Sequence, residues 1–198
     1  MNDNKIVVTK SHFDDFSVPT PWRKFEVICE GRSLFLNAGW LAELSPFFAN
    51  YCFGSDKHPG RATYNASEDL HYNELLEFFR CNFYCPMRKP LNISNVTSVL
   101  RIAKVFNMRV TIARCEKFIA LAAKNLDQTK LLQVTQAVNE CDPNSTTLTL
   151  LVDRIANLSE KDLSTLHFQD IPGDVVADVF THRMNSKKGK KKKLCTLM

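Results

Sequence analysis

Residues 25–53 read FEVICEGRSLFLNAGWLAELSPFFANYCF, and this stretch decides the fold. Residues 25–29 alternate large apolar side chains with polar or small ones, and the apolar residues 34–36 continue as a second short strand. Glu30-Gly31 stands between the two segments and can form a turn. Alternation with a period of two before a glycine turn, and a short apolar segment after it, are typical of paired strands. The segment therefore predicts a β-hairpin.

Two short helices are predicted directly after the hairpin. Trp40, Leu41 and Leu44 recur at a spacing of three to four residues. Ser45 then provides an N-cap and Pro46 occupies the first helical position, which predicts a second helix over residues 46–51. A hairpin with two small helices cannot offset its ordering entropy alone, so later parts of the chain must cover its apolar face.

The order of these elements resembles the opening of a BTB (POZ) domain. The resemblance continues with a strand over residues 61–65 and helices over residues 72–80, 92–108 and 109–121, with Asn92 as the cap of the second of these helices. It implies an α+β fold, namely a small β-sheet flanked by helices and followed by an all-helical extension. The residues that carry the opening pattern are Glu30, Gly31, Leu41, Ser45, Pro46 and Phe48.

Four segments are expected along the chain. Residues 1–22 form an N-terminal arm, which pairs with the partner subunit in BTB dimers or else is a frayed terminus. Residues 23–124 form the BTB/POZ domain. Residues 125–184 form a helical extension similar to the BACK or 3-box extension, with helices over 127–139, 145–158, 159–166 and 172–184. Residues 185–198 form a disordered polybasic prenylation tail.

The composition is that of a folded cytosolic protein whose basic charge lies in the tail. The 198 residues are 44% hydrophobic and 24% charged, with a net charge of +5. Six lysines lie within residues 187–193, and without them 20 basic residues face 21 acidic ones. The sequence contains no apolar run long enough to span a bilayer, and its start is not that of a secretory signal. Irregularly spaced cysteines are typical of reduced thiols.

The sequence predicts neither an enzyme nor a bound cofactor. The five histidines are scattered, and no glycine-rich phosphate loop or nucleophile motif occurs. Cys81 and Cys85, with His71 upstream, could be placed around zinc. No second pair of ligands follows at the spacing of a zinc finger, so ordinary thiols are favoured.

The C-terminus combines two membrane-binding signals. Residues 195–198, CTLM, fit the C-a-a-X box and predict a farnesyl group on Cys195. One lipid chain binds membranes only marginally, whereas each lysine near an anionic leaflet adds about 1 kcal/mol. The two signals together predict a lipid anchor on an anionic cytoplasmic membrane surface. The lysines are Lys187, Lys188, Lys190, Lys191, Lys192 and Lys193.

Other interpretations of the tail are a nuclear localisation signal, a nonspecific nucleic-acid tail and a solvated charge run. A lysine run without arginine or aromatic residues contacts phosphates only. No specific nucleic acid is therefore expected as a partner, and the nucleus is the alternative location.

The BTB resemblance implies protein interaction. Many BTB domains form homodimers through the first helix and the arm, so Trp40 and Leu41 are candidates for a dimer interface, or else belong to the core. Lys24, Asn37 and Ala38 replace the charge pair of the repressor-type pocket. The expected function is a non-enzymatic, oligomeric interaction module tethered to a membrane. The alternative is a substrate adaptor that binds the cullin scaffold of a cullin-RING ubiquitin ligase, with its partner and substrate left open.

Overall fold

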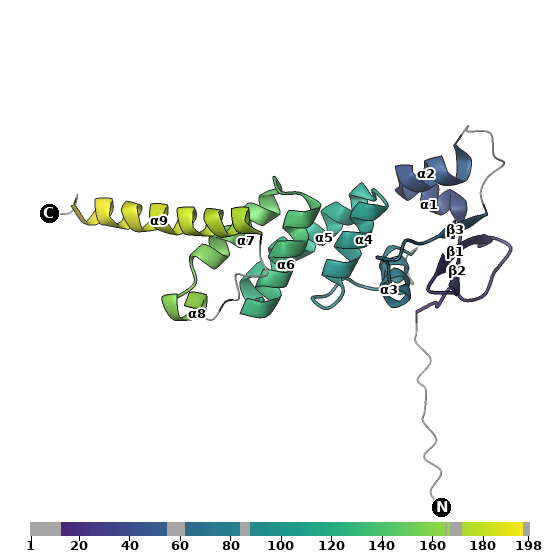
Figure 1. The fold of residues 1–198 in the computed structure, drawn as a ribbon, viewed down its shortest axis with the longest axis horizontal. Helices are drawn as coiled ribbons and strands as arrows, with labels where there is room; N and C mark the ends of the chain where they lie inside the picture. Colours follow the sequence, from purple (N-terminus) through teal and green to yellow (C-terminus); the bar gives the residue numbers. More distant parts are fainter. Residues whose placement is uncertain (1–12, 55–61, 84–87, 165, 167–171, 196–198) are drawn as a thin grey trace, which may run out of the picture. The chain divides into compact units, whose positions relative to one another are not determined.

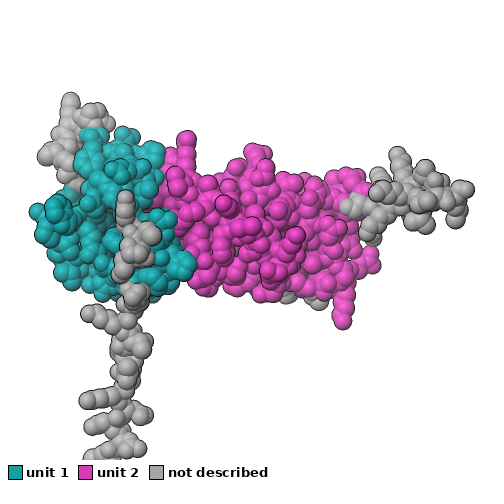
Figure 2. Space-filling view, turned by 180° about the vertical axis from the view of Figure 1, so that it is seen from behind, with its two compact units in different colours: residues 1–90 teal, residues 91–198 magenta. Residues whose placement is uncertain are grey.

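The chain forms two compact units, residues 1–90 and residues 91–198 (Figures 1 and 2). The computed structural model describes residues 13–54, 62–83, 88–164, 166 and 172–195, with side chains of the last helix described as far as Asn185. The described part of the first unit holds a three-stranded sheet and three helices, and that of the second is helical. The predicted α+β class is confirmed. The boundary at residue 90 lies inside the range 23–124 that was expected as one domain.

The predicted hairpin is present, and its first strand is the central strand of the sheet. Strand β1 (Phe25–Cys29) pairs antiparallel with β2 (Arg32–Leu36), and β3 (Thr63–Asn65) pairs parallel with β1, so the order is β2-β1-β3. Glu30 and Gly31 have φ values of 51° and 71°. A two-residue turn with positive φ at both positions matches the right-handed twist of the paired strands.

Helices α1 (Ala38–Leu44) and α2 (Pro46–Phe53) both begin at side-chain caps. Asn37 Oδ1 accepts a hydrogen bond from the Trp40 amide at 3.0 Å. Ser45 Oγ accepts one from the Phe48 amide at 3.1 Å, with proline at the first helical position. The predicted Ser-Pro helix start is therefore confirmed. Each cap satisfies an amide that the helix leaves without an internal partner.

Helix α3 (Tyr72–Asn82) begins against the turn of the hairpin. The Glu30 carboxylate lies 2.8 Å from His71 Nδ1 and accepts a bond of 3.3 Å from the Tyr72 amide. These contacts, the one with His71 first, hold the pKa of Glu30 below its usual value of 4.5. Phe78 and Phe79 are fully buried further along the helix. The start of α3 is thus fixed to the turn that joins β1 and β2.

Phe16 anchors the described part of the N-terminal arm on its own unit. Its side chain is fully buried and packs edge-on against Phe83, with ring centroids 5.2 Å apart. Its carbonyl accepts a hydrogen bond of 2.7 Å from the Phe35 amide in β2. For residues 13–22, the expectation of a frayed terminus is therefore wrong, whereas pairing of the arm with a partner subunit stays a prediction. The reason is one buried aromatic side chain that stands outside any periodic pattern.

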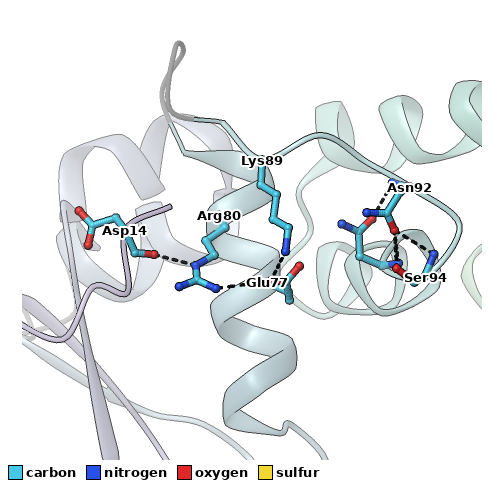
Figure 3. Close-up of polar contacts among 7 residues, drawn as sticks. Asp14, Glu77, Arg80, Lys89, Asn92 and Ser94 are labelled. Carbon is cyan, nitrogen blue, oxygen red and sulfur yellow. Dashed lines mark hydrogen bonds and ion pairs between the residues drawn. The ribbon is translucent and has the colours of Figure 1, made fainter. Parts of the chain in front are cut away.

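A chain of polar contacts also connects the arm to α3 (Figure 3). Arg80 Nε donates to the Asp14 carbonyl at 2.7 Å, and Arg80 Nη1 lies 3.6 Å from Glu77 Oε1. Lys89 Nζ reaches the same Glu77 oxygen at 2.6 Å. The Asp14 carboxylate pairs in turn with Arg23 at 2.6 Å. These half-buried groups hold residues 14–23 in one position.

The described part of the second unit is built from helices that pack on helices one or two places away along the chain. Helix α4 packs on α5 and α6, while α7 packs on α6 and α9. The predicted apolar stripe of α4 is confirmed, because Val96, Val99, Leu100 and Ala103 are fully buried. The elements are α4 (Val96–Val105), α5 (Arg109–Ala122), the 3₁₀ turn η1 (Ala123–Asn125), α6 (Gln128–Cys141), α7 (Thr146–Ala156), α8 (Glu160–Ser164) and α9 (Gly173–Cys195).

Asn92 caps a turn and not helix α4 itself, which corrects the prediction of a helix that starts there. Its Oδ1 accepts bonds from the Ser94 amide (2.9 Å), the Ser94 hydroxyl (2.6 Å) and the Asn95 amide (3.1 Å), as Figure 3 shows. Asn95 Oδ1 accepts from the Asn92 amide at 2.8 Å. These Asn and Ser groups stabilise a separate turn, so that regular helix begins only at Val96.

Helices α6, α7 and α8 are capped by the residues at which the sequence predicts their starts. Asp127 accepts from the Lys130 amide at 2.8 Å at the start of α6, and Ser145 accepts from the Thr147 amide at 3.1 Å at the start of α7. Ser159 accepts from the Asp162 amide at 3.1 Å and donates to the Asp162 carboxylate at 2.6 Å. The predicted Ser-x-x-Asp cap is therefore confirmed at α8.

Helix α9 corrects the prediction of a disordered tail. It runs without interruption from Gly173 to Cys195 and is drawn in yellow in Figure 1. Lysine is a good helix former, and the helix is already nucleated by its packed first half, so adding residues costs less than starting a new helix. Residues 196–198 of the predicted tail lie outside the described residues.

Candidate functional site

A pocket of about 660 Å³ opens on the first unit, beside helix α1. Three separate segments form it, namely the arm, the junction of β2 with α1, and the residue that follows α3. The lining residues are Thr20, Trp22, Arg23, Leu36, Asn37, Gly39, Trp40, Glu43 and Phe83. We call this site the tryptophan pocket, because it contains both tryptophans of the chain.

Three of the nine residues that line the tryptophan pocket are aromatic, namely Trp22, Trp40 and Phe83. Trp40 packs edge-on against Phe83, with ring centroids 6.1 Å apart. Trp22 is 79% exposed. An exposed tryptophan beside a concave aromatic wall offers a large apolar contact area to a partner.

Arg23 is engaged within the unit. Its guanidinium pairs with Asp14 at 2.6 Å and lies over the rings of Phe16 (5.5 Å to the centroid) and Phe83 (5.9 Å). Its amide donates to Thr20 Oγ1 at 3.1 Å. The positive charge of Arg23 is therefore balanced by a carboxylate and does not make the pocket a receptor for anions.

Glu43 gives the pocket its charge. It is exposed and lies one helical turn after Trp40 in α1. In the part of the chain that the structure describes, no cation pairs with it. The side chain of Asn37 is already used as the cap of α1. The pocket therefore combines aromatic walls with a carboxylate that can pair with a cation.

The two residues predicted for a dimer interface, Trp40 and Leu41, lie in different environments. Trp40 lines the pocket, and its role in a dimer stays a prediction. Leu41 is fully buried, so its assignment to a surface interface is wrong. Consecutive residues of a helix point about 100° apart, and one face of α1 must fill the core. The sequence interpretation missed Trp22, Glu43 and Phe83, because only folding brings these residues to one site.

The zinc alternative gains no support. His71 contacts Glu30, Cys81 is fully buried in the core, and Cys85 lies outside the described residues. Among the residues whose positions are described, no group of three or more His, Cys, Asp or Glu side chains could hold a metal ion.

The first half of α9 is held firmly on the second unit. Val175 and Val179 are buried, and His182 Nδ1 lies 2.5 Å from Asp153 Oδ1 in α7. Arg183 Nη1 donates to the carbonyls of Ala156 (3.1 Å) and Leu158 (2.7 Å). The six lysines and Cys195 follow on the same helix. None of the helices, as far as they are described, is long and apolar enough to cross a membrane.

Replacing Arg183 with methionine should loosen α9. The change keeps an apolar stem but removes two charge-assisted hydrogen bonds, which together contribute about 1.5–3 kcal/mol. Amide hydrogen exchange of residues 175–185 should accelerate by tenfold or more, because 1.4 kcal/mol corresponds to tenfold. Asp178→Asn, at an exposed position of the same helix, is the control and should leave exchange unchanged. Equal protection in both variants would show that the two bonds do not hold α9.

The fold and the pocket define an α+β protein with a concave surface that carries three aromatic side chains. No family model matches the chain. It is 49% identical over 193 residues to cytokinesis defective protein 7 of Caenorhabditis elegans, and the alignment covers 94% of this chain and 71% of that protein. The chain therefore belongs to the same family as that nematode protein.

Proposed function

We propose that the protein is a non-enzymatic, BTB-type interaction module, oligomeric, and tethered to the cytoplasmic face of a membrane by a farnesylated, lysine-rich C-terminus. The observation that carries the proposal is helix α9. One helix connects a segment packed on α7 to the six lysines and to Cys195. A membrane contact at the end of this helix would thus act on a folded unit and not on a loose peptide.

The two signals at the end of α9 complement each other. A single prenyl chain gives marginal and reversible membrane binding. Six lysines near an anionic leaflet supply the second signal that stable anchoring requires. The α+β fold and the aromatic pocket support the interaction part of the proposal, since concave aromatic surfaces are typical of sites that bind other molecules.

We further propose that this module acts during cytokinesis. The support is the name of the nematode relative, which links that protein to a defect in cytokinesis, together with 49% identity across most of this chain. The alternative function, a cullin-RING adaptor, stays a prediction that binding to the cullin would test.

Cys195→Ser tests the tether. Full-length protein carrying an N-terminal tag is expected in the membrane fraction of cells, and the serine variant should move almost entirely to the supernatant. Cys141→Ser, at a half-buried position in α6, is the matched control and should stay with the membranes. An unchanged distribution of the Cys195 variant would contradict the tether, and nuclear accumulation of the unaltered protein would favour a localisation signal.

A further inference from the structure

We propose that the tryptophan pocket binds a short segment of another protein that presents a large apolar side chain next to a lysine or arginine. This inference goes beyond the proposed tether and does not depend on it. Two properties of the site carry it. One is the aromatic pocket itself, and the other is the balance of charge along its rim.

The pocket has the size and the walls for an apolar anchor. Its volume of about 660 Å³ exceeds that of any one side chain, so a side chain and its flanking backbone fit together. Trp22 and Trp40 are of the residue type that contributes most to binding at protein interfaces. Trp22, 79% exposed, gains burial only when something covers it.

The charges of the lining residues favour a cation in the partner. Arg23 is compensated by the Asp14 carboxylate at 2.6 Å. Glu43 is exposed on the pocket wall and has no cationic partner among the described residues. An anionic segment would meet the Glu43 carboxylate, whereas a lysine or arginine would pair with it. Complementary charge of this kind selects partners more than it raises affinity.

The site is also largely preformed. The cap from Asn37 fixes the start of α1, from which Trp40 and Glu43 extend. The contacts of Arg23 with Asp14 and Thr20 fix the opposite wall. Walls that are ordered before binding reduce the entropy lost on association, which suits a short and flexible ligand.

Selection followed by titration tests the proposal. The full-length chain is used to select from a random dodecamer peptide library, and the enriched peptides are synthesised and titrated while tryptophan fluorescence is recorded. Because both tryptophans line the pocket, any emission change reports on this site. Enriched peptides should share an aromatic residue or leucine within three positions of a lysine or arginine. They should also shift or quench the emission.

Charge reversal at Glu43 tests the specificity. Glu43→Lys should weaken binding of the basic peptides by tenfold or more and strengthen binding of versions in which glutamate replaces the basic residue. Glu68→Lys, an exposed change in the same unit, should alter neither affinity. Three results would overturn the proposal. They are enrichment without the apolar and basic pattern, binding that leaves the emission unchanged, and an emission that varies with protein concentration alone, which would mean that a second copy covers the pocket.

Discussion

Phe16→Ala is expected to lower the free energy of unfolding of the first unit by about 3–5 kcal/mol. The side chain is fully buried and packs on Phe83, and Arg23 lies over its ring at 5.5 Å. Removing the ring leaves a cavity and takes away the platform beneath Arg23. Because Phe83 also packs on Trp40, the loss should extend to the wall of the tryptophan pocket.

Urea denaturation followed by tryptophan emission measures this loss. Both tryptophans lie in the first unit, so the signal reports on that unit alone. Phe53→Ala is the matched control, because the Phe53 side chain is 62% exposed and its removal should change stability by no more than about 0.5 kcal/mol. If both variants unfold at the same urea concentration, the arm is not part of the folded core.

The elements that the sequence predicted are those with local signals. Glu30-Gly31 adopts positive φ at both positions, and Ser45-Pro46 caps α2 as expected. Turn and cap preferences act over three or four residues, so they can be inferred from a short stretch of sequence. The same holds for Ser159, whose hydroxyl caps α8.

Features that depend on distant segments could not be predicted in this way. Phe16 is buried by Phe83, which lies 67 positions later in the sequence. The tryptophan pocket joins Trp22, Trp40 and Phe83 from three segments. At Leu41 the direction of the side chain depends on which face of α1 fills the core, and the helical spacing of one short segment does not determine that.

The high charge density of the tail predicts disorder when the tail is considered alone. The packed helical segment that directly precedes the tail changes this expectation. Like charges four residues apart destabilise a helix by a few tenths of a kcal/mol per pair. That cost is comparable to the favourable helix propensity of lysine, and the packed residues 175–183 have already supplied the nucleus. From Arg183 to Cys195 the helix extends about 18 Å at 1.5 Å per residue.

Replacing all six tail lysines with glutamine should weaken binding to anionic vesicles by about a thousandfold or more. Each lysine contributes on the order of 1 kcal/mol near an anionic leaflet, and 1.4 kcal/mol corresponds to tenfold in affinity. The full-length chain, with and without a farnesyl group on Cys195, is titrated with vesicles that contain phosphatidylserine. The loss should occur in both forms and should shrink at high salt, because screening shortens the range of these charges.

A matched comparison separates the position of the charges from their number. Lys191, Lys192 and Lys193 changed together to glutamine should reduce vesicle binding by about a hundredfold. The same change at Lys117, Lys124 and Lys161, which are exposed on the second unit, removes equal charge and should have little effect. Equal losses would mean that net charge alone attracts the protein. A loss confined to the variant of Lys191, Lys192 and Lys193 would place the membrane contact at the end of α9. That end lies beyond His182 and Arg183, whose side chains hold the helix on α7.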